Sequence, residues 1–499
     1  MRTEYARERS LGQIVPFIKL QPEWQALKVT GLAVDSRQVR AGDCFLAYPG
    51  HHADGRDYLR AAFAAGAACA LVEAAGFEPP TDLNPLVPVA GLKTQLGVIA
   101  DNFYDHPSAA LGLLAVTGTN GKTSVSQLAA QALTALGQRC GVIGTLGNGL
   151  LEALEPAVNT TPDVVACNRL LAAMRNQGAA FVTMETSSHG LEQGRVNGLC
   201  IRAAVFTNIS RDHLDYHGSM AAYTAAKARL ARHPGLRHLI LNADDERVMA
   251  MAGCASPETR LWTFSLRPEV DATLRLMAAD YHQHGMRSRV AYGQQQAEIR
   301  SPLIGEFNSA NLLATLALLL AVEVPLDQAA DALSRCQPVP GRMQRIVAKA
   351  GGPVVVVDFA HTPAALEHAL VAVRRHTPGR LWCVFGCGGD RDRGKRPLMA
   401  ATVARLADEL VLTADNPRSE KVGAILADMS KGIPVQVAFQ SIEDRTQAIH
   451  YAIRNAAADD LILIAGKGDE TYQEVAGVRH PYSDSAVAQA ALQNLREVH

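Results

Sequence analysis

A glycine-rich turn, GTNGKTS, at residues 118–124 restricts the possible folds of this chain more than any other segment. An apolar run at residues 111–116 precedes the turn, and an amphipathic stretch that ends at Gly137 follows it. A strand that enters a helix through such a turn directs backbone N–H groups and the positive helix terminus at phosphate oxygens. The pattern therefore predicts an α/β domain with a phosphate loop.

The residues of this turn are expected to hold ATP through its phosphates. Lys122 would neutralise the β- and γ-phosphates, and Thr123 would offer its hydroxyl to Mg²⁺. Val116 stands where the strict phosphate-loop pattern has its first glycine, so a chance glycine-rich turn is the alternative. The order of strand, turn and helix favours ATP binding by Gly118, Thr119, Asn120, Gly121, Lys122, Thr123 and Ser124.

Length and charge limit the remaining possibilities. A chain of 499 residues is too long for one ordinary core, and at roughly 100–200 residues per domain we expect about three domains. Its 48 basic and 49 acidic residues give no excess of either sign, which argues against nucleic acid or a membrane surface as a partner. The first ten residues lack the apolar centre of a signal peptide, and the longest apolar run, residues 312–322, is too short to span a bilayer. We therefore expect a cytoplasmic protein without membrane insertion.

Proline-containing segments mark two expected domain boundaries. His106-Pro107-Ser108 precedes the apolar run before the turn, and QPVPG at residues 337–341 follows an Ala/Leu-rich helical region. These breaks predict domains at residues 1–108, 109–338 and 339–499. Each domain is expected to be α/β, with a sheet and flanking helices.

Strand-like runs in the last domain alternate with helical stretches, which predicts a Rossmann-like parallel sheet. The runs lie at residues 354–357, 381–385, 410–413 and 461–465. Four residues lie at or just past the carboxyl ends of these runs, namely Asp358, Asp390, Asp415 and Gly466. Open parallel sheets bind ligands at that edge, so these residues predict a ligand site. Unrelated turns that favour Asp and Gly are the alternative.

Two strand-like runs in the central domain lead into residues that can bind metal. Glu185 follows the run at residues 181–184, and its carboxylate can hold Mg²⁺ against the γ-phosphate. His213 follows the run at residues 205–209. A lone histidine is usually structural, but its position beside two other site loops favours a ligand role. Lys227 alone reads as a solvated lysine on a helix.

Together these motifs resemble those of the ADP-forming Mur ligases of peptidoglycan synthesis. They occur in the order GTNGKTS, METSSHGLEQGRV, NISRDHLDYHG, GRMQ, DFAHTP, GCGGDRDRGKRP, DNPR and GKGDE. The resemblance is closest to members that add meso-diaminopimelate to UDP-N-acetylmuramoyl-L-alanyl-D-glutamate. It implies that the three domains hold the UDP end of the substrate, ATP and the amino acid, in that order. It also implies a Mg²⁺-dependent ligase, expected to be a monomer, that forms an acyl phosphate and releases ADP.

The resemblance assigns further residues by motif matching. Lys227 matches a lysine that the family carries as a carbamate, N6-carboxylysine, which supports a second Mg²⁺. The implied catalytic residues are Lys122, Glu185, His213 and Lys227, and the implied metal ligands are Thr123, Glu185, His213 and carbamylated Lys227. The UDP-substrate residues are Val34, Ser36, His51, His52, Ala53, Asn159, Thr160, Thr161, Ser187, Gln193 and Arg195. The adenine and ribose residues are Asn308, Arg342, Asp358 and His361. Ser124 and His52 depart from the usual motif without an expected change in the reaction.

Arg418, in the motif DNPR, is expected to select the amino acid. A guanidinium fork pairs bidentately with a carboxylate, and diaminopimelate carries a carboxylate that lysine lacks. An arginine left without this partner can discriminate against lysine by roughly 10⁴ or more. The other implied diaminopimelate contacts are Arg391, Asp415, Asn416, Pro417, Gly466 and Glu470, whose charged members would otherwise read as surface residues.

Other functions remain as alternatives. A lysine-adding ligase or a folate polyglutamate synthase would differ at Arg418 and at the uridine-side residues Ser36 and His51, which favour diaminopimelate addition. A protein that only binds nucleotide as a switch is a different class. ADP release that depends on the amino acid would distinguish it from a ligase.

Overall fold

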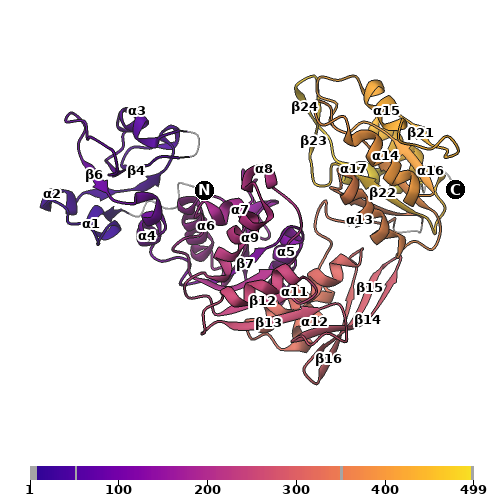
Figure 1. Ribbon diagram of the computed structural model, residues 1–499, viewed down its shortest axis with the longest axis horizontal. Helices are drawn as coiled ribbons and strands as arrows, with labels where there is room; N and C mark the ends of the chain where they lie inside the picture. The colour runs from indigo at the N-terminus through magenta and orange to yellow at the C-terminus, as the bar shows by residue number, and fades with distance from the viewer. Residues whose placement is uncertain (1–7, 51–52, 349–351, 496–499) are drawn as a thin grey trace. The chain divides into compact units, whose positions relative to one another are not determined.

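The protein is described from a computed structural model that covers residues 8–50, 53–348 and 352–495 (Figure 1). Contacts within the chain divide it into two compact units. The first unit comprises Met1–Phe264 and Ala317–Val324, and the second comprises Ser265–Leu316 and Pro325–His499. The three domain boundaries expected from the sequence remain a prediction.

The first unit begins with a parallel sheet in the order β3-β4-β5-β6. Alternate side chains of its buried strands pack on α4 (Leu92–Tyr104) on one face and on α3 (Leu59–Ala64) on the other. The strands are β3 (Gly31–Ala33), β4 (Asp43–Ala47), β5 (Cys69–Glu73) and β6 (Leu86–Val89), preceded by α1 (Leu11–Ile14), α2 (Pro22–Gln25) and an antiparallel pair, β1 (Arg9–Ser10) and β2 (Lys28–Val29).

A larger sheet follows in the first unit, with strands in the order β13-β12-β11-β7-β10-β8-β9. Only β9 runs antiparallel to its neighbour in this series. Because β7 lies between β10 and β11, the loops after these three strands meet at one edge of the sheet. The strands are β7 (Gly112–Thr117), β8 (Cys140–Gly144), β9 (Gly147–Leu150), β10 (Phe181–Glu185), β11 (Ile201–Phe206), β12 (His238–Asn242) and β13 (Arg260–Ser265).

Helices and short turns connect the strands of this larger sheet. Residues 188–192 and 214–217 form single short helices that lead out of the loops after β10 and β11. The helices are α5 (Lys122–Ala135), α6 (Val164–Asn176), α7 (Ser188–Glu192), α8 (Leu214–His217), α9 (Met220–Ala231) and α10 (Glu246–Met249).

The second unit contains a six-stranded sheet in the order β17-β18-β22-β19-β20-β21. All its neighbours are parallel except β17 and β18. One face packs on α13, α14 and α15, and the other packs on α16 and α17, so the sheet is doubly wound. The strands are β17 (Gln344–Ile346), β18 (Val354–Asp358), β19 (Leu381–Phe385), β20 (Glu409–Leu412), β21 (Gln440–Ser441) and β22 (Leu461–Ala465).

The other elements of the second unit include antiparallel strands that the sequence analysis did not predict. Strands β14 (Leu274–His282), β15 (Gly285–Tyr292) and β16 (Gln295–Ser301) form a meander, and β23 (Tyr472–Val475) pairs with β24 (Val478–Pro481). The helices are α11 (Phe307–Ala321), which belongs to this unit as far as Leu316, α12 (Leu326–Ser334), α13 (Pro363–Arg374), α14 (Lys395–Leu406), α15 (Val422–Ser430), α16 (Arg445–Asn455) and α17 (Asp484–Asn494).

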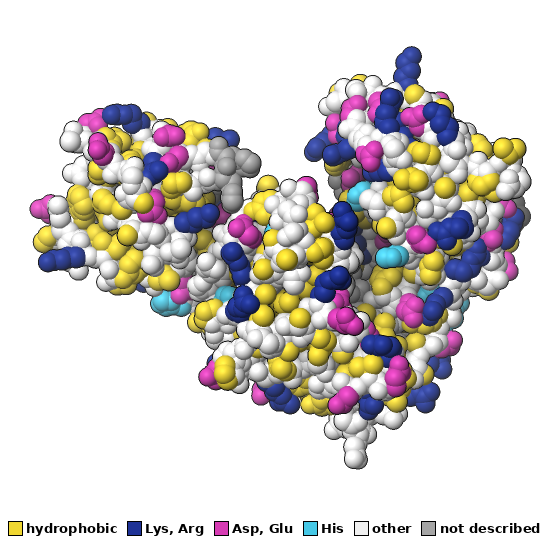
Figure 2. All heavy atoms as spheres, in the orientation of Figure 1, with side chains coloured by type: hydrophobic (Ala, Val, Ile, Leu, Met, Phe, Trp, Pro, Cys, Tyr) yellow, Lys and Arg dark blue, Asp and Glu magenta, His cyan; other side chains and the backbone are white. Residues whose placement is uncertain are grey.

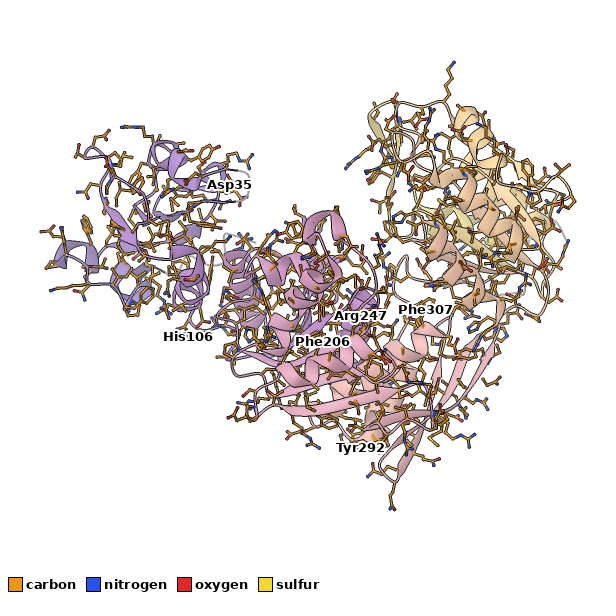
Figure 3. The ribbon with its side chains drawn as sticks, viewed as in Figure 1. Asp35, His106, Phe206, Arg247, Tyr292 and Phe307 are labelled. Atoms are coloured by element: carbon orange, nitrogen blue, oxygen red, sulfur yellow. The ribbon has the colours of Figure 1, made fainter. Side chains whose placement is uncertain are left out.

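The expected α/β fold class is confirmed, with one strand misplaced. The sequence predicted a strand at residues 205–209, but β11 ends at Phe206 (Figure 3). Thr207 N–H still donates to Thr117 at the end of β7, and beyond it the chain bonds to the turn after β7: Thr207 Oγ1 donates to the carbonyl of Asn120, and Asn208 O accepts from the N–H of Thr119 at 2.8 Å.

The exposed side chains of opposite charge are interspersed on the face drawn in Figure 2, in keeping with the formal charge of −1. Among the described residues, none of the helices has the length and apolar character needed to cross a bilayer. The apolar run at residues 312–322 lies largely within α11 and is buried in the folded chain.

Candidate functional site

The phosphate loop joins β7 to α5 at the centre of the larger sheet. Gly121 precedes the helix with φ +85°, a left-handed conformation that favours glycine. Gly118 has φ +151°, and a Cβ there would collide with the Thr207 hydroxyl. The backbone therefore requires both glycines, and α5 begins directly after Gly121, so its positive amino terminus lies at the loop, as an anion site needs.

The tip of the loop is fixed by the segment after β11. The N–H of Asn120 donates to Asn208 Oδ1 at 2.9 Å, and Asn208 Nδ2 donates back to the carbonyl of Asn120 at 3.1 Å. The hydroxyls of Thr119 and Tyr223 lie 2.9 Å apart. Two loop amides, those of Thr119 and Asn120, are thus already bonded within the protein. The sequence analysis missed Asn208 and Tyr223, although both stand in or near the quoted motifs.

Lys122 folds back over the loop. Its Nζ donates to the carbonyls of Gly118 and Thr119, each at 2.9 Å. The ammonium therefore lies at the loop itself, where a triphosphate could replace these carbonyls as its partner.

Thr123 and Glu185 join the phosphate loop to the end of β10. The hydroxyl of Thr123 donates to Glu185 Oε2 at 3.0 Å, and the N–H of Thr145 donates to Glu185 Oε1 at 2.9 Å. Only 1% of Glu185 is exposed. Burial raises the pKa of its carboxyl, although the Thr145 N–H and the charge of Lys122 oppose the shift. A buried carboxylate beside a hydroxyl is a hard-oxygen donor pair that suits Mg²⁺.

Lys227 is buried behind the phosphate loop, not solvated as its sequence context alone suggested. Its side chain on α9 is 1% exposed, and Nζ donates to the carbonyl of Gly118 at 2.8 Å. Nζ also lies 4.8 Å from the centroid of the Tyr223 ring. Burial, reinforced by the charge of Lys122, lowers the pKa of Lys227 well below its ordinary value. The environment therefore disfavours the charged form of this amine.

His213 lies in an aromatic cluster beside the loop rather than in contact with Glu185. Its ring centroid is 4.9 Å from that of His189 and 6.4 Å from that of Tyr223. Its Nε2 is 3.4 Å from Asp212 Oδ2. In the described part of the chain, no group of three or more His, Cys, Asp or Glu side chains is arranged to hold a metal ion.

Several residues matched to the muramoyl peptide form one network after β10. The Thr161 hydroxyl donates to the carbonyl of Glu185 at 2.9 Å and to Ser187 Oγ at 3.1 Å. Arg195 donates through Nε and Nη2 to Gln193 Oε1, at 3.0 and 2.7 Å, and through Nη1 to the carbonyl of Thr161. This joins the network to the backbone of Glu185. The hydroxyl of Thr160 lies 3.0 Å from that of Thr145, which bonds to the Glu185 carboxylate, whereas Asn159 is exposed.

Three of the uridine-side residues, Val34, Ser36 and Ala53, lie on loops that follow β3 and β4. Ser36 begins a short 3₁₀ helix capped by Asp35, which is labelled in Figure 3. Val34 packs against the core of this sheet, and the carbonyl of Ala53 accepts from the N–H of Gly50 at 2.9 Å. The other two assigned residues, His51 and His52, lie outside the described residues.

Tyr48 is a neighbour of these loops that the sequence analysis missed. Burial raises the pKa of its hydroxyl, and the charge of Asp163 acts in the same direction while that of Arg195 opposes it. Tyr48 therefore lies within electrostatic reach of the muramoyl-side network. Tyr48 stands in an apolar stretch of the sequence, which gave no indication of a role in the site.

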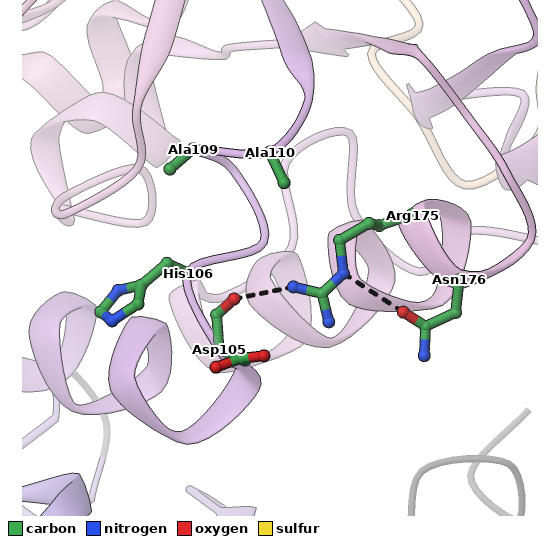
Figure 4. Close-up of a pocket in the computed structure, with 6 residues that line it drawn as sticks. All are labelled: Asp105, His106, Ala109, Ala110, Arg175 and Asn176. Carbon is green, nitrogen blue, oxygen red and sulfur yellow. Dashed lines mark hydrogen bonds between the residues drawn. The ribbon is translucent and has the colours of Figure 1, made fainter.

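Two open cavities in the first unit do not contain the assigned nucleotide residues. One, of about 590 Å³, is lined by Asp105, His106, Ala109, Ala110, Arg175 and Asn176 (Figure 4). There Arg175 already donates to the carbonyl of Asp105 at 2.7 Å and to Asn176 Oδ1 at 3.2 Å. The other, of about 580 Å³, is lined by Arg37, Gln38, Val39, Arg40, Glu155, Arg169, Leu170 and Ala173, close to Ser36 in the chain. Cavity size therefore does not identify the site.

In the second unit, three of the residues assigned to adenine and ribose gather near the end of β18. Asp358 Oδ2 accepts from the N–H of Met343 at 2.9 Å, and burial raises the pKa of the Asp358 carboxyl. The guanidinium of Arg342 lies 5.0 Å from the Phe359 ring centroid, and His361 Nδ1 is 2.8 Å from the Phe359 carbonyl. Asn308 differs: its Nδ2 donates to the carbonyl of Ile304, just before α11, and its Oδ1 accepts from Asn311 Nδ2.

The residues assigned to the amino acid meet at the carboxyl edge of the β18–β22 sheet. Arg418 has φ +51°, and its Nη1 donates to the carbonyl of Gly389 at 2.7 Å. The N–H of Gly389 donates in turn to the carbonyl of Asn416 at 2.9 Å. The loops that carry Arg391 and Arg418 are therefore joined, and Arg391 itself is exposed.

Glu470 and Asn416 form a polar cluster with a residue that the sequence analysis missed, Lys467. Asn416 Nδ2 donates to Glu470 Oε2 at 2.9 Å, and Lys467 Nζ donates to the same oxygen at 2.8 Å. Gly466 has φ +121°, and a Cβ there would lie 2.6 Å from Asp415 Oδ2. Lys467 stands in the quoted motif GKGDE, but its burial could not be read from the sequence.

Comparison with known families matches three stretches of the chain. Residues 28–104 match the catalytic domain of the Mur ligase family. Residues 116–319 match the Mur ligase middle domain, and residues 341–468 match the Mur ligase glutamate ligase domain.

Individual relatives resemble nearly the whole chain. UDP-N-acetylmuramoyl-L-alanyl-D-glutamate–2,6-diaminopimelate ligase of Pseudomonas aeruginosa is 50% identical over 487 residues, which cover 97% of this chain and 98% of the relative. The protein of the same name from Xanthomonas campestris is 47% identical over 492 residues, 98% of each chain. A solved structure of a ligase with this name has a TM-score of 0.78 at 37% identity and covers 98% of this chain and 100% of its own. A folylpolyglutamate synthase from Mycobacterium tuberculosis, with a TM-score of 0.58 at 19% identity over 81% of this chain and 95% of its own, shares the fold.

Proposed function

Because this chain belongs to the Mur ligase family, we propose that it joins meso-2,6-diaminopimelate to UDP-N-acetylmuramoyl-L-alanyl-D-glutamate at the expense of ATP. The observation that carries the proposal is the phosphate loop with Thr123 bonded to the buried carboxylate of Glu185, in a chain 50% identical to a ligase of this name. The reaction is a step of peptidoglycan precursor synthesis.

The chemistry follows from the weak electrophilicity of a carboxylate. One oxygen of the γ-carboxylate of the D-glutamyl residue attacks the γ-phosphorus of ATP, and the bond to the β,γ-bridging oxygen breaks to release ADP. The amine of diaminopimelate then attacks the acyl carbon, loses a proton and displaces inorganic phosphate. This sequence requires charge stabilisation and positioning rather than an enzyme nucleophile.

Lys122 and the amino terminus of α5 supply the charge stabilisation in this proposal. Lys122 Nζ exchanges its bonds to the carbonyls of Gly118 and Thr119 for phosphate oxygens, which carry more negative charge. The first-turn N–H groups of α5 bind the same phosphates. The amides of Thr119 and Asn120 instead hold the loop in shape, since Asn208 already accepts from both.

The donor set beside the loop fits Mg²⁺. Thr123 and Glu185 are hard oxygen donors, and a cation there would offset the cost of burying the Glu185 carboxylate. Bound Mg²⁺ would neutralise charge on the transferring phosphoryl group. His213 would complete the set only from the edge of its aromatic cluster, so Thr123 and Glu185 are its principal proposed ligands.

Lys227 is proposed to carry the carbamate. Its lowered pKa favours the neutral amine, which is the form that attacks CO₂ and loses a proton to give an N-carboxylate. The product carries a negative charge near Lys122, which attracts the Lys122 ammonium, and it would supply oxygen donors for a second Mg²⁺.

The two substrates are assigned to opposite ends of the chain. The UDP end is held by the loops of Ser36 and Ala53 with His51 and His52, and the peptide by the network around Thr161 and Arg195. Diaminopimelate is held by the cluster around Arg418 and Glu470, with Arg391 as a further carboxylate partner. Arg418 Nη1 donates to the carbonyl of Gly389 and Nε lies 3.7 Å from Glu474 Oε2, so a substrate carboxylate would compete with Glu474 for this guanidinium. We further propose that the protein acts as a monomer in the cytoplasm, where ATP is supplied.

A coupled assay of ADP release tests this function. With UDP-N-acetylmuramoyl-L-alanyl-D-glutamate, ATP and Mg²⁺, we expect turnover with meso-diaminopimelate and little with L-lysine. Preferential turnover with lysine would support a lysine-adding ligase instead. ADP release that ignores both amino acids would identify a nucleotide-hydrolysing module.

A further inference from the structure

Lys467 is a buried cation at the carboxyl end of β22. Its side chain is 0% exposed, and its Nζ lies 5.6 Å and 6.0 Å from the ring centroids of Tyr472 and Tyr482. Burying an ammonium is costly unless it is paired and hydrogen-bonded. Nζ donates to Glu470 Oε2 at 2.8 Å and to Asn416 Oδ1 at 3.0 Å. Those two partners are the reason that the cation can occupy this position.

Both hydrogen bonds that Glu470 accepts from this cluster end on the same oxygen. Asn416 Nδ2 and Lys467 Nζ each donate to Oε2, at 2.9 and 2.8 Å. The Glu470 side chain is 25% exposed, so the carboxylate is reachable from outside the cluster. Oε1 takes neither bond and can accept from a ligand.

Asn416 is committed to the protein rather than to a ligand. It is 3% exposed, its Nδ2 donates to Glu470, and its Oδ1 accepts from Lys467 Nζ and from the N–H of Glu474 at 2.9 Å. The partners fix which end of the amide is which, because the ammonium and the N–H can only donate. Lys467 and Asn416 therefore jointly hold the Glu470 carboxylate in place.

We propose that Lys467 is a positioning residue for the amino-acid substrate, which fixes Glu470 Oε2 so that Oε1 receives an ammonium group of diaminopimelate. This inference rests on the proposed function and deepens it. Without Lys467, the Glu470 carboxylate loses its charged partner and keeps only the bond from Asn416 Nδ2 in this cluster. Binding of the amino acid is then weaker, because it must also order the Glu470 carboxylate, which costs conformational entropy.

The first measurement compares wild-type protein with Lys467→Met. Loss of a hydrogen bond to a charged group predicts a rise in KM for meso-diaminopimelate on the order of tenfold to a hundredfold. The KM for ATP and the melting temperature should change little. Lys431→Met is the matched control, because Lys431 pairs with Asp428 at 2.7 Å on the surface, with 70% of its side chain exposed. An unchanged KM for diaminopimelate in Lys467→Met would overturn the proposal.

A double-mutant cycle with Glu470→Gln separates positioning from a purely structural role. If Lys467 acts through Glu470, Lys467→Met should add little to the KM of the Glu470→Gln variant. Equal losses in both backgrounds would overturn the proposal. Should Lys467→Met not fold, as judged by circular dichroism, Lys467→Gln replaces it in the same cycle. Absence of ligation by the wild-type protein would refute the proposed function instead, so the two failures are distinguishable.

Discussion

The hydroxyl of Thr123 lies 3.0 Å from the carboxylate of Glu185, which joins the first turn of α5 to the end of β10. The two groups come from separate motifs but share one edge of the sheet, because β10 pairs directly with β7. The proposed phosphate chemistry depends on this contact between Thr123 and Glu185.

Glu185→Gln tests the role of the buried carboxylate. The amide keeps the size of the side chain but removes the negative charge that would hold Mg²⁺, so kcat should fall by about 10²–10³. The Mg²⁺ concentration for half-maximal activity should also rise. Steady-state kinetics over a Mg²⁺ series measures both, with Glu152→Gln as control because Glu152 pairs with Arg139 on the surface. Normal turnover in Glu185→Gln would exclude the proposed metal site.

Lys227 should make stability depend on pH. Its folded pKa lies well below 10.5 because of burial and the charge of Lys122. Between the folded and unfolded pKa values the unfolded chain binds more protons, so the free energy of unfolding rises with pH across that window. In CO₂-free buffer, wild-type protein should gain stability relative to Lys227→Met as pH rises toward 10.5. Urea denaturation at successive pH values measures this, and a pH-independent difference would be evidence against it.

Arg418→Lys tests the selection of the amino acid. Lysine keeps the charge but cannot fork onto a carboxylate, so KM for meso-diaminopimelate should rise about tenfold or more while KM for ATP is retained. Arg405→Lys is the control, since Arg405 pairs with Glu367 on the surface. Unchanged kinetics with diaminopimelate would remove Arg418 from the proposed site.

Arg445 and Asp484 should matter for stability. Both side chains are 0% exposed, and Arg445 Nε and Nη2 each donate to the carboxylate at 2.7 Å. Asp484→Asn would leave a buried guanidinium without its counter-charge and should cost about 3–5 kcal/mol. Chemical denaturation measures the loss, and Glu367→Gln on the surface should change little. Equal stability of the two variants would contradict the prediction.

The elements that the sequence predicted are those with a strong local signal. The phosphate loop stands out because glycine is required at positions 118 and 121, and β18, β19 and β22 stand out because strands buried on both faces are continuously apolar. The meander of β14, β15 and β16 was missed because exposed charges such as Arg287 and Arg289 alternate with its buried side chains.

The sequence named candidate site residues, but it did not indicate the environment that the fold gives them. In the sequence, Lys227 resembles a surface lysine and Lys467 is one position of a quoted motif. Both side chains are nevertheless buried by elements distant in the chain. Likewise, His213 stands in the expected loop, but its ring contacts depend on α7 and α9. Burial and the orientation of a side chain arise from tertiary packing, which no local pattern specifies.

The most direct test of the central claim follows an oxygen atom. UDP-N-acetylmuramoyl-L-alanyl-D-glutamate labelled with ¹⁸O in the γ-carboxylate is incubated with the protein, ATP, Mg²⁺ and meso-diaminopimelate, and the released phosphate is analysed by mass spectrometry. An acyl phosphate predicts one ¹⁸O atom in each phosphate, because the attacking carboxylate oxygen leaves with it. Unlabelled phosphate accompanying tripeptide formation would contradict the account.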